Sequence, residues 1–223
     1  MNKVNLTKIT PSTKLTDAMV EFIEIQGYLR EEIDLLCHLT KHPEKVSSDT
    51  QFVRGFAYRA LIKQFGSFID SFNFMLRNMV LAMSEKELTT RFNKHEITVL
   101  RNEKIIVKDN GNVVVRESFL SSATDLEFSF KCFLKAYCDG AELEKGEGWE
   151  SFQKFLKIRN RLTHPKGFDG LSVSGAEFAI FQSTEKWFLK QLMAAVEAAV
   201  ENQPFLNVSL SSRDHSREGA LKN

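Results

Sequence analysis

The spacing of apolar residues along the chain predicts several long amphipathic helices. Apolar residues recur every three or four positions from about 16 to 40, and His42-Pro43 ends this pattern. A longer helix is predicted from about 50 to 84, and the segment 48–51 before it resembles a capping box. The apolar side of this second helix carries Leu61, Phe65, Phe68, Phe72, Met75 and Met79.

The pattern changes between residues 97 and 116. Three short β-branched runs, at 97–100, 104–108 and 113–116, replace the helical spacing. Asn110-Gly111 separates the last two runs, and this pair tolerates the positive φ angles that a tight hairpin turn requires. We therefore expect a small β insertion in a helical protein.

Helical spacing returns in the second half of the chain. Helices are predicted from about 120 to 137, from Trp149 to His164-Pro165, and from a capping box at 174–177 onward. A loop at 167–170 separates the last two. The apolar side of the final helix carries Phe181, Phe188, Leu192, Ala195 and Ala199. The fold class that follows is all-α with a small β hairpin.

Three parts of the chain are distinguished on this basis. Residues 1–47 are predicted to form an N-terminal helix packed on the core. Residues 48–203 form a helical domain that carries the β insertion at about 97–116. Residues 204–223 are polar, and we expect them to be a flexible tail.

Composition narrows the function classes. The chain has 223 residues and a net charge of +1, so a binding site for a polyanion must be a local patch. Its first 14 residues contain no apolar signal core, and no window is long enough to span a membrane. We therefore expect a cytoplasmic protein that does not bind membranes. The 19 phenylalanines exceed ordinary usage, which favours a Phe-rich core with some apolar surface left for a subunit interface.

Segment 157–166, with the sequence KIRNRLTHPK, carries the strongest chemical signal. Arginine and histidine together can bind a phosphodiester and move protons on it. Asn160, Thr163 and His164 share one helix face, whereas Arg159 lies about 140° around the helix from His164. We expect Pro165 to unwind the last turn and so to bring these side chains together. The alternative is a solvated basic helix end, which the helix dipole favours.

This segment resembles the signature of the HEPN (higher eukaryotes and prokaryotes nucleotide-binding) superfamily, in which R-(N/D/H)-x-x-x-H lies on a late helix of a helical bundle. The resemblance implies a HEPN-type bundle and assigns the catalytic roles to three residues. Arg159 would bind and polarise the scissile phosphate, His164 would act as general acid or base, and Asn160 would orient one of them. Further residues would contact RNA, and these are Arg161, Lys157, Lys166 and Thr163.

Members of this family often carry an upstream acidic or polar residue that faces the motif. Asp70 is our candidate for this supporting position, with Arg59 and Asn73 as weaker ones. A solvent-facing aspartate is an equally good interpretation of Asp70 from sequence alone.

The resemblance implies a metal-independent endoribonuclease that acts as a toxin or as a phage-defence or stress effector. Its active site would form where two protomers of a homodimer pair, and RNA would be its substrate. An antitoxin such as a minimal nucleotidyltransferase would be a further partner. The competing interpretation is a catalytically inactive RNA-binding or protein-interaction module.

No cofactor or metal is expected. His38 and His42 lie one helical turn apart beside Cys37, a spacing that can hold zinc. Without further ligands, the pair is more often two solvated imidazoles at a helix end.

Overall fold

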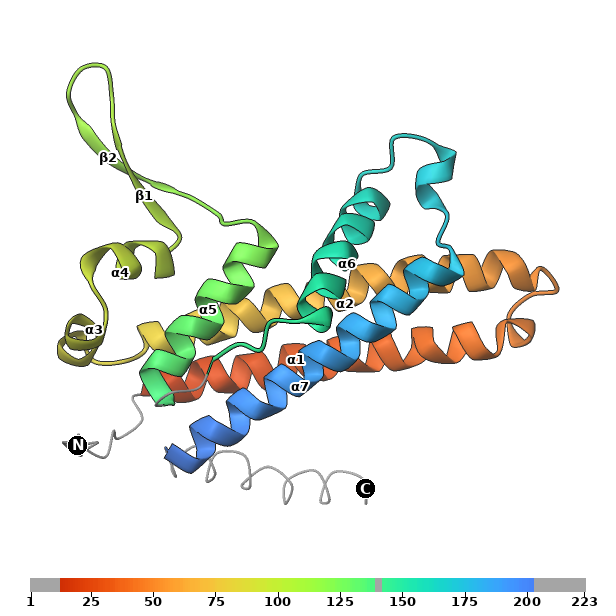
Figure 1. The fold of residues 1–223 in the computed structure, drawn as a ribbon, viewed down its shortest axis with the longest axis horizontal. Helices are drawn as coiled ribbons and strands as arrows, with labels where there is room; N and C mark the ends of the chain where they lie inside the picture. Colours follow the sequence, from red (N-terminus) through yellow and green to blue (C-terminus); the bar gives the residue numbers. More distant parts are fainter. Residues whose placement is uncertain (1–12, 139–141, 203–223) are drawn as a thin grey trace, which may run out of the picture.

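The computed structural model describes residues 13–138 and 142–202, and it shows a mostly helical protein with one two-stranded antiparallel sheet (Figure 1). The predicted all-α class with a β hairpin is therefore confirmed at this level. The elements in chain order are α1 (Thr13–Lys41), η1 (Pro43–Lys45), α2 (Thr50–Leu81), α3 (Glu85–Arg91), α4 (Lys94–Leu100), β1 (Glu103–Val107), β2 (Val113–Glu117), α5 (Ser122–Tyr137), α6 (Glu147–Thr163), η2 (Phe168–Leu171) and α7 (Gly175–Asn202).

Helix α2 is the centre of the molecule. It runs beside α1 over much of its length, and α5, α6 and α7 pack on it as well (Figure 1). Its predicted apolar side is buried as expected, with Phe68 partly so. The ring of Phe65 meets those of Phe155, Phe181 and Phe188 edge to face at 5.5–5.9 Å between centroids. These aromatic contacts join α2, α6 and α7 in one core.

Some phenylalanines remain outside this core. Phe52, Phe56 and Phe74 on α2 are exposed, whereas Phe130 and Phe133 on α5 are buried. The expectation of a Phe-rich core with apolar side chains left on the surface therefore matches the structure.

The N-cap and the end of α2 differ from the prediction. Asp49 is its N-cap, and the carboxylate accepts a hydrogen bond from the Phe52 amide at 2.9 Å. The predicted capping box at 48–51 is therefore wrong, because the cap lies one residue later. The helix ends at Leu81 rather than near 84, since Ser84 forms a capping box with Glu87 that starts α3.

The expected strand at 97–100 is also wrong, because these residues belong to α4. Asn93 caps this helix and forms a capping box with Glu96. Ile97 and Leu100 then lie three residues apart on one buried face. The local cap and the i, i+3 burial outweigh the β propensity of the run Ile-Thr-Val-Leu, so the β insertion begins only after Asn102.

The hairpin itself is confirmed. β1 and β2 pair antiparallel with Ile105 opposite Val115 and Val107 opposite Val113. Gly111 has a φ of 77°, as the predicted turn requires. The sheet projects away from the helices beside α4 (Figure 1).

The remaining elements follow the prediction closely. α5 begins two residues later than expected and α6 two residues earlier, and the predicted capping box at Ser174 and Glu177 is present. The expected loop at 167–170 contains the short helix η2. The predicted tail at 204–223 and the side chain of Ala199 lie outside the described residues. None of the described helices has the length and apolarity that a membrane span requires.

Candidate functional site

The motif arginine lies across α2. α6 buries Phe152, Phe155, Ile158 and Leu162 against the core, and Arg159 follows directly after Ile158. Its side chain passes over Gly66, where a Cβ atom would lie only 2.8 Å from Nε and 3.2 Å from Cγ. The guanidinium then forms an ion pair with Asp70, one helical turn further along α2. The absence of a side chain at Gly66 thus opens the path that joins Arg159 to Asp70.

Asp70 therefore faces the motif, as one of the two sequence interpretations expected. Desolvation by burial raises the pKa of its carboxyl, and the positive charge and hydrogen bond of Arg159 oppose this rise. The pair is not sealed from water, since 22% of the Arg159 side chain and 45% of the Asp70 side chain are exposed. Both partners can consequently reach a ligand from solvent.

His164 is the C-cap of α6 and is exposed. Its φ of −125° and ψ of 65° lie outside the helical region, as the following proline demands. The helix nevertheless stays regular through Thr163, because the His164 amide donates to the Asn160 carbonyl at 3.0 Å. The Thr163 hydroxyl donates back to the Arg159 carbonyl at 2.8 Å. The predicted unwinding of the last turn is therefore wrong, since Pro165 restrains only the residue before it.

The motif side chains are consequently neighbours on one helix end rather than a bonded cluster. Within the described chain, no hydrogen bond or ion pair joins Arg159 to His164. The side chains of Asn160 and His164 are both exposed, and neither has a hydrogen-bond partner in that part of the protein. The imidazole and the amide are thus free to meet a ligand or a second protomer.

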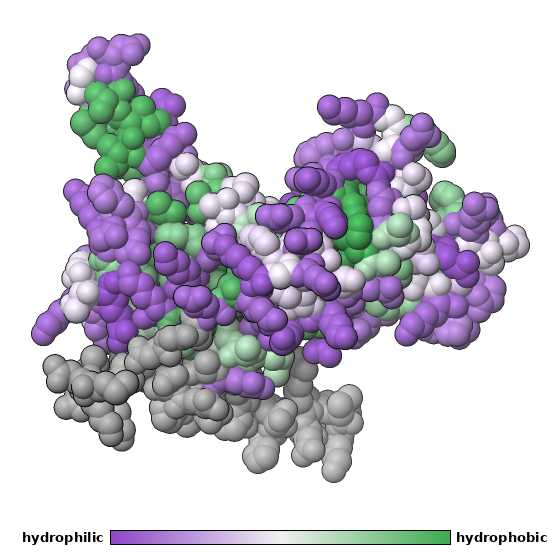
Figure 2. Space-filling view, viewed as in Figure 1, coloured by the Kyte–Doolittle hydropathy of each residue, from purple (hydrophilic) through white to green (hydrophobic). Residues whose placement is uncertain are grey.

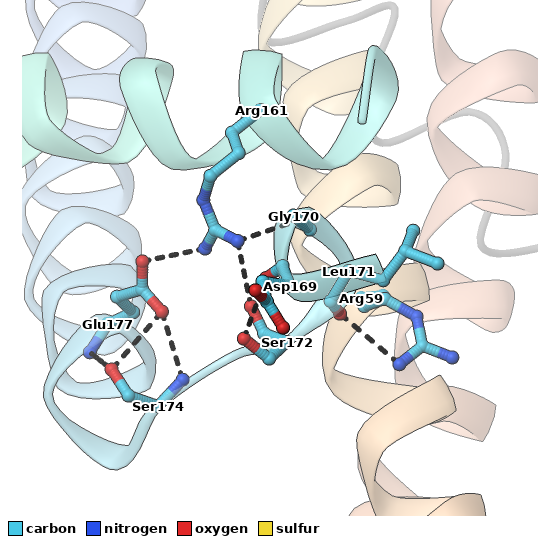
Figure 3. Close-up of polar contacts among 8 residues, drawn as sticks. All are labelled: Arg59, Arg161, Asp169, Gly170, Leu171, Ser172, Ser174 and Glu177. Carbon is cyan, nitrogen blue, oxygen red and sulfur yellow. Dashed lines mark hydrogen bonds and ion pairs between the residues drawn. The ribbon is translucent and has the colours of Figure 1, made fainter. Parts of the chain in front are cut away.

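Arg161 has a different environment from the one that the sequence indicated. It donates to the carbonyls of Gly170 and Ser172 at 2.8 and 2.9 Å, and it pairs with Glu177 at 2.7 Å (Figure 3). These bonds tie the end of α6 to the segment around η2 and to the start of α7. Each of these acceptors belongs to the protein itself, so this arginine holds the loop after the motif, although 33% of its side chain is exposed.

Two further groups strengthen this tie. Glu177 also accepts from the Ser174 amide and hydroxyl, at 2.9 and 3.1 Å (Figure 3). Burial acts to raise the pKa of its carboxyl, but the hydrogen bonds from Ser174 and the charge of Arg161 hold that pKa below the ordinary value. Arg59 on α2 donates to the Leu171 carbonyl at 3.3 Å. The loop that follows His164 is therefore fixed from three helices.

Lysines supply the accessible positive charge near the motif. Lys154, Lys157 and Lys166 are exposed, and none has a hydrogen bond or ion pair to another described residue. Such side chains can contact a phosphate backbone. Lys166 also follows the negative end of the α6 dipole, so the solvated helix end stays open as an explanation.

A second arginine centre was missed by the sequence reasoning. Arg77 on α2 is 5% exposed and binds Asp125 and Ser129 of α5 and the side chain of Asn102. Asn73, one turn before it, is fully buried, and neither polar atom of its side chain has a partner among the described residues. The available signal was the spacing of Asp70, Asn73 and Arg77 at i, i+3 and i+7 on a Phe-rich helix.

The pattern at His38 and His42 does not develop into a metal site. The two rings lie 4.8 Å apart between centroids, and His42 faces Glu44 at 3.4 Å. No group of three or more histidine, cysteine or acidic side chains that could hold a metal lies within residues 13–138 and 142–202.

Comparison with protein-family models, with curated proteins and with solved structures finds no match for this chain.

Proposed function

We propose that the protein is a metal-independent endoribonuclease of the HEPN type that acts as a homodimer. The observation that carries this proposal is the end of α6, where the partly exposed Arg159 pairs with Asp70 and the exposed His164 caps the same helix. One group can bind a phosphate and the other can transfer protons near neutral pH. Both are reachable from solvent.

The chemistry begins with an exchange of partners at Arg159. A scissile phosphate replaces Asp70 as the acceptor of the guanidinium hydrogen bonds, and Asp70 keeps the side chain in position over Gly66 until then. The bound guanidinium offsets the negative charge that grows on the phosphoryl oxygens in the transition state.

Histidine then moves the protons. The neutral imidazole of His164 takes the proton of the ribose 2′-OH, whose oxygen attacks the adjacent phosphorus. The P–O5′ bond breaks, and a protonated imidazole gives its proton to the leaving 5′ oxygen. The products are a 2′,3′-cyclic phosphate and a 5′-hydroxyl end, so DNA, which lacks the 2′-OH, is not a substrate. In the homodimer, the two His164 side chains divide the roles of base and acid, and Asn160 orients the imidazole or the phosphate.

The accessible lysines guide the RNA backbone. Lys157 and Lys166 are exposed beside the motif, and Thr163 is the last residue of α6. Cleavage is therefore expected to weaken as salt rises. Arg161 has no such role in the proposal, because its guanidinium is engaged by Gly170, Ser172 and Glu177.

The biological role that fits this activity is that of a toxin or a phage-defence or stress effector. An RNA-cleaving protein of this kind needs restraint in its own cell, and an antitoxin such as a minimal nucleotidyltransferase would supply it.

The alternative is a catalytically inactive module that binds RNA or protein. One observation favours it: the guanidinium groups of both motif arginines already have internal acceptors. In such a module, Arg159 would tie α6 to α2 in the way that Arg161 ties α6 to α7.

One experiment separates the two. The purified protein is incubated in excess EDTA with labelled single-stranded RNA and with DNA of matching sequence, beside the double variant Arg159→Ala/His164→Ala. The nuclease proposal requires RNA cleavage that the double variant loses, with DNA left intact. If neither protein cleaves RNA, the inactive module is the better explanation, and cleavage that survives in the double variant excludes this site.

A further inference from the structure

Helix α2 exposes one narrow stripe along its length. After residue 54, its exposed residues are Phe56, Lys63, Ser67, Asp70 and Phe74. At about 100° per residue, these positions fall within an arc of about 60° around the helix. The phenylalanines at the two ends, Phe56 and Phe74, are 49% and 58% exposed. We call this solvent-facing surface the α2 stripe.

The neighbouring helices border the α2 stripe without covering it. On one side α1 packs on α2, and Gln64 of α2 donates to Glu32 of α1. On the other side Arg159 of α6 passes over Gly66, and α6 then rises from α2 away from α1 (Figure 1). The α2 stripe is therefore the side of α2 that remains between α1 and α6, opposite the Phe-rich core.

Along the α2 stripe, apolar groups lie at the two ends and opposite charges lie between them. Phe56 and Phe74 have their midpoint beside Gly66. Lys63 and Asp70 have nearly the same midpoint. When a second copy of α2 lies antiparallel on the stripe about this shared centre, each Phe56 meets Phe74 of the partner subunit. Each Lys63 then lies within one helical turn of the partner's Asp70.

The charges favour a second copy of the chain as the occupant of this surface. Lys63 is exposed, and its ammonium has no acceptor among the described residues. Asp70 is the acid that pairs with Arg159, and 45% of its side chain is exposed. In the antiparallel pairing, each Lys63 gains a carboxylate and each Asp70 gains a second cation. The same patch on both copies thus complements itself about a two-fold axis, as a closed dimer requires.

We propose that two copies of this chain associate through the α2 stripe, with their α2 helices antiparallel and crossing at a shallow angle of about 20°. From Phe56 to Phe74 the contact is about 27 Å long, at about 1.5 Å per residue. A specific interface covers about 800 Å² on each partner, which corresponds to a circle about 32 Å across. The α2 stripe supplies most of this length, and the adjoining surfaces of α1 and α6 supply the width.

This pairing brings the two motif helices together. The two-fold axis is perpendicular to the plane that contains both α2 helices, and it passes near Gly66 of each copy. Such an axis keeps both α6 helices on the same side of that plane, and each α6 crosses its own α2 beside the axis. The two His164 side chains then lie at neighbouring helix ends, which is the arrangement that the proposed nuclease needs and the point at which the inference rests on that proposed function. Lys63 of the partner subunit also gives Asp70 another cation when Arg159 turns to a phosphate.

The lysines near the motif stay accessible in this dimer. Lys157 and Arg159 are two residues apart, so their side chains lie about 160° apart around α6. Lys157 therefore points away from the α2 surface that Arg159 contacts. Lys166 follows the end of α6, which rises away from α2 (Figure 1). RNA can consequently reach both lysines from outside the interface.

The test is sedimentation velocity of the full chain over a concentration series, without RNA and at a salt concentration of about 0.15 M, which screens charges more than about 8 Å apart. Phe56→Lys/Phe74→Lys is expected to weaken association at least tenfold, about 1.4 kcal/mol, because like charges then face each other. The matched control is Val107→Lys/Val113→Lys in the hairpin, where Figure 2 shows another apolar cluster on the projecting arm. These two valines are 67% and 64% exposed, and their replacement should leave association unchanged. Circular dichroism verifies that each variant keeps its helices.

Further variants test the antiparallel register. Phe56→Lys/Phe74→Glu puts opposite charges face to face, so it should associate at least tenfold more tightly than the double lysine variant. Lys63→Glu should weaken association severalfold, since it places a glutamate near the partner's Asp70. A monomer at every concentration, equal association of the Lys/Lys and Lys/Glu variants, an unaffected Lys63→Glu or a hairpin variant that dissociates would each overturn the proposal. Because the measurement contains no RNA, a dimer of this kind that cleaves nothing leaves the interface standing and removes only the nuclease.

Discussion

Helix α2 contributes one residue to each of two Arg–Asp ion pairs, and the two arginines differ in exposure and in the number of acceptors that they bind. Arg77 pairs with Asp125, and their side chains are 6% and 24% exposed. Arg159 pairs with Asp70, and the corresponding values are 22% and 45%. Arg77 also donates to Ser129 at 3.2 Å and to Asn102, whereas the Arg159 guanidinium has Asp70 as its one acceptor among the described residues. The first pair is closed, and the second can exchange its acceptor for a ligand.

The pKa shifts of the two aspartates have the same direction and the same main causes. Burial raises the pKa of both aspartates, and in each case the neighbouring arginine opposes the rise. The charge of Asp70 contributes to the raised pKa of Asp125, so the two centres influence each other along α2. A buried arginine with three partners indicates a structural role, and a partly exposed one that pairs with a single aspartate is the better candidate for binding phosphate.

Removing Arg77 should give the largest effect. Arg77→Met leaves Asp125 partly buried without its cation and frees the side chain of Asn102 at the base of the hairpin. We expect a loss of about 3–5 kcal/mol in the free energy of unfolding, measured by urea denaturation. Arg159→Met, the matched change at the more exposed pair, should cost below about 1 kcal/mol. Equal losses at the two sites would contradict the comparison.

A double change sharpens the same point. Arg77→Met/Asp125→Leu removes both charges and leaves apolar groups of similar size, which should recover much of the stability lost by Arg77→Met alone. If the double variant is as unstable as the single one, the loss comes from packing and not from an unpaired carboxylate.

Asn73 lies on α2 between the two pairs and should give the next largest effect. It is fully buried, and neither of its polar side-chain atoms has a partner among the described residues. Asn73→Leu keeps the number and branching of the side-chain heavy atoms and removes this polar group, so we expect a gain of about 1–2 kcal/mol in the free energy of unfolding. Asn73→Ala is the control, since it removes the amide without filling the space. A loss of stability with leucine would show that the amide has a necessary partner.

The sequence predicted the elements better than it predicted the contacts between them. Helical spacing located the Phe-rich face of α2, and Asn110-Gly111 located the hairpin turn. The prediction from sequence failed at 97–100, where a capping box formed by Asn93 and Glu96 outweighs the β propensity of the β-branched residues. Local patterns of residues are enough for the first two cases, whereas the third depends on which of two local preferences the tertiary burial supports.

The candidate site shows the same limit. The motif on α6 and the supporting Asp70 could be proposed from residue types and a resemblance. The partners of Arg159 and Arg161 could not, because Gly66 lies 93 positions before Arg159 in the chain and the loop carbonyls have no sequence signature. Two arginines separated by one residue thus bind different acceptors, and only the packing of α6 on α2 and α7 determines which ones.

The pH dependence of stability separates Asp70 from Arg159. Because the folded pKa of Asp70 is raised, its carboxyl favours the folded state most when protonated, at low pH. This contribution is lost as pH rises from the ordinary carboxyl pKa through the raised one. Asp70→Asn should lack that loss, so its stability relative to the unaltered protein should rise across this pH range, by less than about 1 kcal/mol. The measurement is the difference between the two urea denaturation curves across acidic pH, in which the contribution of Asp125 cancels except for the part that depends on the charge of Asp70. If Asp70→Asn loses stability relative to the unaltered protein as pH rises, the charge of Arg159 outweighs the desolvation of Asp70 in setting its pKa.

The smallest change in stability is expected at Gly66, where the open pair depends on a missing side chain. Gly66→Ala should gain up to about 1 kcal/mol from helix propensity. The new Cβ lies 2.8 Å from the Arg159 Nε, so the arginine must move and its pairing with Asp70 is weakened. These effects oppose each other, and the net change in the free energy of unfolding should be small. Gly27→Ala on α1 is the matched control, since a Cβ there meets nothing within 4 Å. If the nuclease proposal is right, Gly66→Ala lowers RNA cleavage severalfold while Gly27→Ala leaves it unchanged. Equal cleavage by both variants would mean that the position of Arg159 over α2 has no part in the reaction.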